Sequence, residues 1–152
     1  MNYNDLMAKF AAKYGIGDLE CKDGTTALEF DGVLTSFIHD PKNDAILIVT
    51  EVGEPAFDDK GRFGDMLLRA NYLFRSTGGG IFCRHPETGV YCLFKQFALA
   101  QMTLDEFCHE VARILEQTDA WHTAMENYLQ VLDEADETAS APPPSSMIFL
   151  RV

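Results

Sequence analysis

The sequence predicts an α+β fold in which helices pack on an antiparallel sheet. Two observations lead to this prediction. Apolar residues recur with helical spacing near the start, in the middle and toward the end of the chain, and the segments between them are short strand-like runs closed by turn signals. The connections between those runs are too short for parallel crossovers. The predicted order is helix, three strands, helix, two strands, helix.

The first half of the chain predicts one helix and three strands. Residues 3–14 carry apolar side chains at intervals of three and four positions, and Gly15 ends that helix. The Asp31-Gly32 dipeptide is a tight-turn signal, because glycine accepts a positive φ. The stretch 45–50 lacks polar alternation, which indicates burial on both faces of the sheet. The predicted strands are 26–31, 33–39 and 45–50.

The second half predicts a helix over residues 63–74, a hairpin, and a long helix that begins near Thr103. Thr103 and Glu106 form a capping box, in which each side chain satisfies a free backbone N–H group. Apolar residues then recur on one face to about residue 130, and Trp121 shares that face. We therefore expect Trp121 to pack against the sheet. The hairpin strands are predicted at 81–85 and 90–97.

The helix predicted over residues 63–74 is apolar on nearly every side. A helix with one wet face shows an apolar stripe, whereas a helix that is apolar all round has to be covered all round. A chain of 152 residues cannot easily enclose a central helix, so a second copy of the chain is the expected cover. The residues that cannot all face one core are Leu67, Leu68, Tyr72 and Phe74.

Charge narrows the choice of partners. The chain has 24 acidic and 12 basic residues, a formal charge of −12. Such a surface disfavours nucleic acid, which is bound through Lys and Arg, and it disfavours anionic membranes. No stretch approaches the ~20 apolar residues of a membrane span, and the N-terminus lacks the order of a secretory signal. We expect a cytoplasmic protein whose acidity provides solubility or attracts a basic partner.

Residues that could do chemistry are present but are not arranged for it. The glycines at 78–80 follow a helix and open a strand, so no helix N-terminus faces an anion there. Four histidines show no metal-ligand spacing. Cys83 and Cys92 could face each other across the hairpin, with His85 nearby, as a thiol site or a disulfide, although reduced structural cysteines are more common. We predict no enzyme, no cofactor and no metal.

The chain resembles the class I type III secretion chaperones of bacteria, the Tir chaperone family. The resemblance covers roughly residues 3–130. It depends on the order of the elements, on residues 52–55 (Val-Gly-Glu-Pro) ahead of 67–71 (Leu-Leu-Arg-Ala-Asn), and on the glycines at 78–80 before a strand. It implies an ATP-independent, homodimeric chaperone that holds an extended segment of a secreted effector or another type III secretion protein.

The resemblance also implies which residues would act. The dimer contact would join the middle helix and the strand after it, through Leu67, Leu68, Asn71, Tyr72, Phe74 and Phe82. The client surface would use the first helix and the first strands, through Leu6, Phe10, Val33, Thr35 and Phe37. The alternative interpretation is a regulatory or structural protein-binding domain of the same fold without an export client.

The composition changes after residue 132, which divides the chain into a domain at 1–132 and a tail at 133–152. Residues 133–146 are polar and proline-rich, and we predict that they do not fold. Residues 147–150 are apolar, and exposing such a run to water is unfavourable. We expect them to dock on an apolar surface, either of this protein or of a neighbouring molecule.

Overall fold

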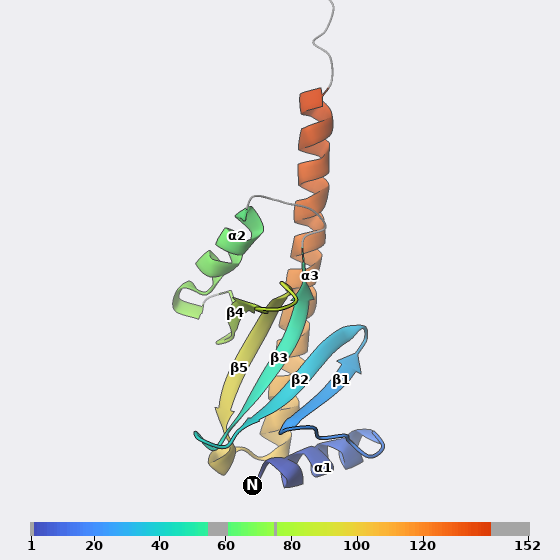
Figure 1. Cartoon of the computed structure of the whole chain (residues 1–152), viewed down its shortest axis with the longest axis vertical. Helices are drawn as coiled ribbons and strands as arrows, with labels where there is room; N and C mark the ends of the chain where they lie inside the picture. The colour runs from blue at the N-terminus through green and yellow to red at the C-terminus, as the bar shows by residue number, and fades with distance from the viewer. Residues whose placement is uncertain (1, 55–60, 75, 141–152) are drawn as a thin grey trace, which may run out of the picture.

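The computed structural model describes residues 2–54, 61–74 and 76–140, with side chains as far as Tyr128. The fold is α+β, and its elements follow the predicted order (Figure 1). The helices and strands are α1 (Tyr3–Tyr14), β1 (Thr25–Phe30), β2 (Val33–Asp40), β3 (Ala45–Gly53), α2 (Arg62–Ala70), β4 (Ile81–Arg84), β5 (Tyr91–Ala98) and α3 (Leu104–Ser140). The short 3₁₀ turns η1 (Tyr72–Phe74) and η2 (Leu99–Gln101) follow α2 and β5.

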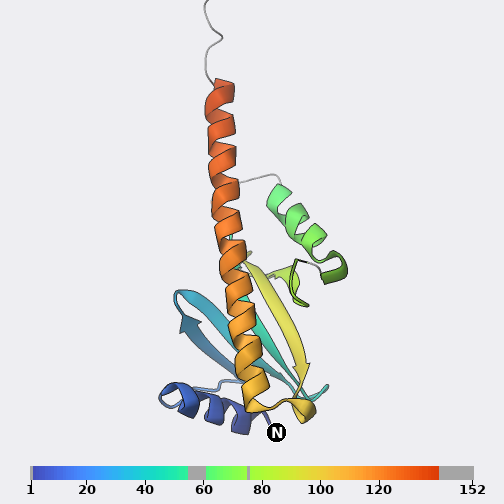
Figure 2. The same cartoon turned by 180° about the vertical axis from the view of Figure 1, so that it is seen from behind.

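The strands form one antiparallel sheet in the order β1-β2-β3-β5-β4. Phe37 of β2 lies opposite Ile48 of β3, and Ile48 lies opposite Lys95 of β5. Every second residue of a strand points to the same face, so this row marks one face, which we call the inner face. Helix α3 lies along that face, behind the sheet in Figure 1 and in front of it in Figure 2.

The inner face closes on an aromatic cluster from α1, β2 and α3. The side chains of Phe10, Phe37 and Phe107 are at most 1% exposed. Their ring centroids are 5.2 Å apart for Phe10 and Phe107, and 5.6 Å apart for Phe37 and Phe107. Burial of one such side chain stabilises a fold by roughly 1.5–3 kcal/mol. The cluster therefore holds both helices on the sheet.

Helix α3 begins where the capping box predicts but runs further than expected. The Thr103 hydroxyl accepts from the Glu106 backbone N–H (3.3 Å), and the Thr103 backbone N–H donates to the Glu106 carboxylate (2.9 Å). The helix then continues to Ser140. The prediction that the chain is unfolded from residue 133 is therefore wrong for residues 133–140. Residues 141–152, including the apolar run at 147–150, lie outside the described residues, and the division at residue 132 stays a prediction.

Helix α2 is shorter than predicted and is not covered by protein on all sides. It ends at Ala70 rather than at residue 74, and the turn after it carries Leu73 and Phe74 with φ of 56° and 54°. A left-handed conformation is unfavourable for residues with a side chain, so it interrupts the helix. Leu67 faces the core and is 2% exposed, whereas Leu68 is 69% exposed. The inference that the middle helix must be covered on all sides is therefore wrong. Its Leu68 side chain is nevertheless apolar and exposed.

Trp121 of α3 is a packing residue, but it lies at the border of the core. Its indole meets the Phe82 ring edge to face, with centroids 4.9 Å apart. The indole N–H donates to the Ser76 carbonyl oxygen (3.1 Å). The amide of Gln117, oriented to suit its neighbours, bonds the next two loop residues, Thr77 and Gly78. Helix α3 thus holds the connection that leads from α2 into β4.

We expect Trp121→Ala to lower the free energy of unfolding by about 3 kcal/mol, the lower end of the range for large core aromatics, because this ring is only partly buried. Trp121→Phe keeps a ring against Phe82 and loses the donor to Ser76, so it should cost about 1 kcal/mol. Urea unfolding followed by circular dichroism measures both values. A loss below 1 kcal/mol for the alanine variant would contradict this packing role.

Candidate protein-binding surfaces

The structure exposes a group of large apolar side chains beside β4, which we call the apolar platform. Leu68 of α2 is 69% exposed, and Tyr72 in the following turn is 73% exposed. The full group is Leu68, Tyr72, Leu73, Phe74 and Ile81. Soluble proteins seldom expose a contiguous apolar patch without using it for contact. The platform is therefore a candidate protein interface.

Asn71 fixes the platform to the sheet. Its side-chain oxygen accepts from the Phe82 backbone N–H (2.8 Å), and its amide nitrogen donates to the Phe82 carbonyl oxygen (3.2 Å). These are the bonds that a neighbouring strand would make, so Asn71 satisfies the edge of β4 at this point. The left-handed residues that follow it turn the chain sharply. Asn71 is half-buried, and both polar groups of its side chain are hydrogen-bonded.

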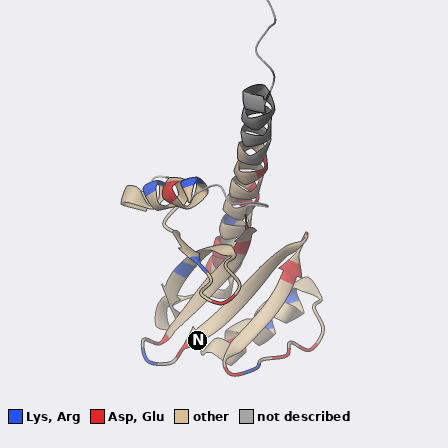
Figure 3. Cartoon of the chain, turned by 45° about the horizontal axis from the view of Figure 1, so that its top comes forward, with Lys and Arg blue, Asp and Glu red and all other residues tan. Residues whose placement is uncertain are grey.

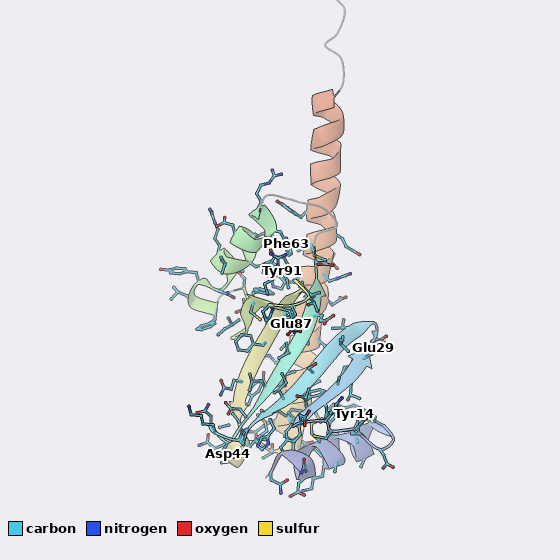
Figure 4. The ribbon with its side chains drawn as sticks, viewed as in Figure 1. Tyr14, Glu29, Asp44, Phe63, Glu87 and Tyr91 are labelled. Carbon is cyan, nitrogen blue, oxygen red and sulfur yellow. The ribbon has the colours of Figure 1, made fainter. Side chains whose placement is uncertain are left out.

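A groove of about 370 Å³ separates α2 from the β4–β5 hairpin. Its lining includes Tyr91, whose ring meets that of Phe63 edge to face at 5.4 Å; the two side chains lie together in Figure 4. Gly64 lets α2 lie close to the Tyr91 side chain of β5, since a Cβ at this position would be only 2.8 Å from the Tyr91 hydroxyl. Leu68 and Cys83 line the same groove. The groove and the platform thus form one continuous apolar region.

The outer face of the sheet is a second candidate surface. No helix within the described residues lies on it, as the front view shows (Figure 1). Its side chains alternate with those of the inner face and, apart from the buried Ala45 and Cys92, are half-buried or exposed. They include Leu34, Ile38, Leu47, Val49 and Phe94. The prediction that β3 is buried on both faces is therefore only half right. An apolar face of this kind can receive the side chains of an extended segment.

A third surface is the groove of about 720 Å³ between α1 and the loop that leads to β1. Small side chains of α1 open this groove, since Ala8, Ala11 and Ala12 line it. Ile16 and Leu19 contribute apolar atoms from the loop. This face of α1 is not among the surfaces predicted from the sequence. The spacing of the three alanines, at i, i+3 and i+4, was the signal that could have indicated it.

Acidic side chains surround the α1 groove and the neighbouring sheet edge. Between residues 15 and 32 the chain has five acids and one lysine, and all six are exposed. The ribbon in Figure 3 is coloured red at acidic and blue at basic positions. The acids are Asp18, Glu20, Asp23, Glu29 and Asp31. Glu29 lies in β1, which forms one edge of the sheet, and the other four acids lie in the segments before and after that strand. An extended segment that approaches this edge meets a negative field, which favours basic partners.

The residues that the sequence assigned to client contact lie mainly in the core. Leu6, Thr35 and Phe37 are fully buried, Phe10 is 1% exposed, and Val33 is half-buried. A buried side chain cannot contact a partner on the surface, so this assignment needs correction. In β2 the error is one residue: positions 33, 35 and 37 point inward, and the open face carries 34, 36 and 38. In α1 the residues on the groove side include the three alanines, together with Asn4 and Met7.

The predicted dimer residues divide into three groups by exposure. Leu68, Tyr72 and Phe74 are exposed and belong to the apolar platform. Leu67 and Phe82 are buried in this protomer, at 2% and 4% exposure, and therefore support the platform from beneath. Asn71 is half-buried and holds the strand edge. Leu73 was missed because the turn that exposes it was predicted as helix. Ile81 lies in the predicted strand but was not named as an interface residue.

The described part of the chain offers little for catalysis. No group of three or more His, Cys, Asp or Glu side chains there is placed to hold a metal ion. Within the same residues, none of the helices is long and apolar enough to span a membrane. What these residues do provide is apolar surface with polar margins, which suits the binding of another polypeptide.

Comparisons with known proteins support this conclusion. Residues 5–122 match the Tir chaperone protein (CesT) family. No curated protein sequence matches the chain. Among solved structures, the chain is similar to one in the ExsC–ExsE complex, with a TM-score of 0.71 and 24% identity over 82% of this chain and 97% of that one.

Two further solved structures share the fold at lower identity. A chain in the complex of the Yersinia pestis type III secretion chaperone SycH with a fragment of YscM2 has a TM-score of 0.61 and 13% identity, covering 79% of this chain and 99% of that one. YbjN from E. coli has a TM-score of 0.56 and 13% identity, covering 82% and 92%. The family match spans most of the sequence. The protein therefore belongs to the Tir chaperone protein (CesT) family, whose members bind proteins and are not enzymes.

Proposed function

We propose that this protein is a homodimeric chaperone of the bacterial cytoplasm that binds an extended segment of a type III secretion protein and keeps it ready for export without ATP. The observation that carries the proposal is the pair of uncovered apolar regions in a member of this family, the platform and the outer sheet face. Solved relatives include a type III secretion chaperone in complex with a protein fragment.

The platform is the proposed dimer contact. Its five members come from α2, η1 and β4, which are neighbours in space because Asn71 bonds β4. Two copies related by a twofold axis would place Tyr72 and Phe74 of each against the groove of the other, since a twofold contact pairs the same patch with itself. Aromatic side chains that fill apolar grooves are typical anchors of stable interfaces.

The outer face and the α1 groove are the proposed client surface. An extended segment could add to the free edge of β1 through main-chain hydrogen bonds and place alternate side chains on the sheet. A side chain of moderate size would enter the α1 groove between Ala8 and Ala12. The surrounding acids would favour a client segment with lysine or arginine. Binding of this kind gains its energy from burial and backbone pairing, so it needs no nucleotide.

The α1 groove can be tested by filling it. Ala12 is exposed and lines the groove, so Ala12→Trp should leave the fold intact and weaken client binding at least about tenfold, which corresponds to ~1.4 kcal/mol. Ala112 is an exposed alanine on α3, and Ala112→Trp is the matched control. The client is identified by purification of the tagged protein from its native bacterium, and its binding segment is then titrated calorimetrically with and without ATP.

The results separate the alternatives. Weaker binding of the Ala12 variant alone, unaffected by ATP, agrees with the proposal. Equal affinities for both variants would place the client elsewhere. YbjN, which shares the fold, is described as a candidate transcription regulator, so a regulatory protein-binding domain is the second candidate. A partner that is retained in the cell and is not exported by the type III apparatus would favour this second function.

A further inference from the structure

Two cysteines face each other across the hairpin that borders the platform. Cys83 of β4 is the register partner of Cys92 of β5. Both are free thiols in the structure. Their neighbours Phe82 and Leu93, also partners, are buried on the inner face. Because side chains alternate along a strand, the two thiols share the outer face.

The pairing brings the two cysteines within reach of a strained, easily reduced disulfide. The His85 N–H donates to the Val90 carbonyl oxygen (2.8 Å), and partners along an antiparallel ladder alternate in type. Cys83 and Cys92, one full repeat further on, are therefore a hydrogen-bonded pair. The backbone of Phe82 agrees, since it bonds outward to Asn71. Such pairs have Cα atoms ≈5.5 Å apart, within the spacing of natural disulfides. Their Cβ atoms lie about 5.5 Å apart, wider than the roughly 3.5–4.5 Å of a relaxed disulfide. The strands must therefore draw together locally to form the bond, and a bond under such strain is readily reduced.

The two thiols differ in access. Cys83 is exposed and lines the groove next to Leu68, whereas Cys92 is 4% exposed. Burial raises the pKa of Cys83, and burial together with the neighbouring Cys83 raises the pKa of Cys92 to about 11. Both groups are therefore thiols at neutral pH, and an oxidant in solution reaches the pair through Cys83.

We propose that Cys83 and Cys92 are a reversible dithiol that a small disulfide such as glutathione disulfide oxidises to a cross-strand bond. In the first step the Cys83 sulfur attacks glutathione disulfide, loses its proton, and releases one reduced glutathione. In the second step the Cys92 sulfur attacks the Cys83 sulfur of the mixed disulfide and releases the second glutathione. Two protein thiols are oxidised and one glutathione disulfide is reduced to two thiols. Excess glutathione reverses both steps through the exposed sulfur.

The bond would fasten the edge strand that carries the platform. Strand β4 has four residues, and its outer edge is held at Phe82 by one asparagine. A covalent link to β5 would stop this strand from separating, and it would remove the exposed thiol from the groove. The inference depends on the hairpin and on an open groove at Cys83. Where the proposed dimer covers this groove, the exchange takes place in the dissociated protomer, and the inference holds whether or not the chain acts as a chaperone.

The test is thiol mapping of the full native chain in glutathione buffers of increasing oxidising strength. After acid quenching, denaturation and alkylation, trypsin cuts at Arg84 and Lys95, which places the two cysteines in separate peptides. We expect residues 76–84 to be linked to 85–95 in oxidising buffer, and the link to disappear in excess reduced glutathione. Cys21→Ser removes the other exposed cysteine and should leave the link unchanged.

Single variants check the order of the steps. Cys92→Ser should accumulate glutathione on Cys83, and Cys83→Ser should leave Cys92 reduced and open to alkylation after unfolding. The proposal is overturned if the unmodified chain keeps both thiols free under oxidising conditions. It is equally overturned if Cys83 carries glutathione while Cys92 stays reduced, because the second step would then not occur.

Discussion

Leu68→Asp is expected to convert the protein from a dimer into a monomer. The Leu68 side chain is 69% exposed in one protomer and lies between the platform and the α2 groove. Full burial of a leucine contributes about 2 kcal/mol, and a twofold contact loses this contribution twice. The total, about 4 kcal/mol, weakens association roughly a thousandfold before the penalty for burying two carboxylates is added.

Light scattering at micromolar concentration measures this change directly. Leu34→Asp is the matched control, because Leu34 is 41% exposed on the outer face of the sheet, away from α2. That variant should remain dimeric and should weaken client binding. A stable monomer for the unmodified protein would refute the proposed dimer. Dissociation of the Leu34 variant alone would move the contact to the sheet.

The fold was predictable because periodicity and turn chemistry agree in most of the chain. The Asp31-Gly32 turn joins β1 and β2 with both residues at positive φ, as the dipeptide indicates. The capping box at Thr103 begins α3 within one residue of its observed start. These signals are local, so a single sequence contains them. The order of the strands followed from short connections that leave little choice of partner.

The errors arose where the deciding contact is distant in sequence. Helix α2 gives way to a left-handed turn at Leu73 and Phe74. This turn lies beside Asn71, whose side chain bonds the backbone of Phe82, eleven residues later, and periodicity carries no sign of that bond. In β2 an alternating pattern does not say which of its two faces a helix will cover. Phe37 is inside because Phe10 and Phe107 meet it there. Helix α3 passes residue 132 because acidic and alanine-bearing stretches can also be helical.

Removing Glu110 is expected to destabilise the protein far more than removing Lys95, although the two side chains form one ion pair. Lys95 Nζ lies 3.1 Å from Glu110 Oε2, and the Lys95 side chain is 5% exposed beneath α3. In Glu110→Gln the buried ammonium loses its charged partner, which typically costs about 3–5 kcal/mol. In Lys95→Met an apolar chain of similar size fills the site, while Glu110 keeps Arg113 at 3.1 Å. We expect the methionine variant to lie within about 1 kcal/mol of the unmodified protein.

Acid unfolding gives an independent check on the same pair. Burial by itself raises the pKa of Glu110, but the hydrogen bond and charge of Lys95, together with Arg113, outweigh it and hold this pKa below its ordinary value of 4.5. A carboxyl group whose pKa is lowered by folding stabilises the protein above its unfolded pKa, and that contribution is lost as the pH falls through the folded value. Stability of the unmodified protein should therefore decline below about pH 4.5, and the Glu110→Gln variant should decline less over the same interval. Urea unfolding at fixed protein concentration between pH 7 and pH 3 measures both effects. Equal losses of unfolding free energy for Glu110→Gln and Lys95→Met at pH 7 would contradict this prediction. They would mean that Lys95 reaches water when its partner is gone, and that the pair is not buried in the way that the structure shows.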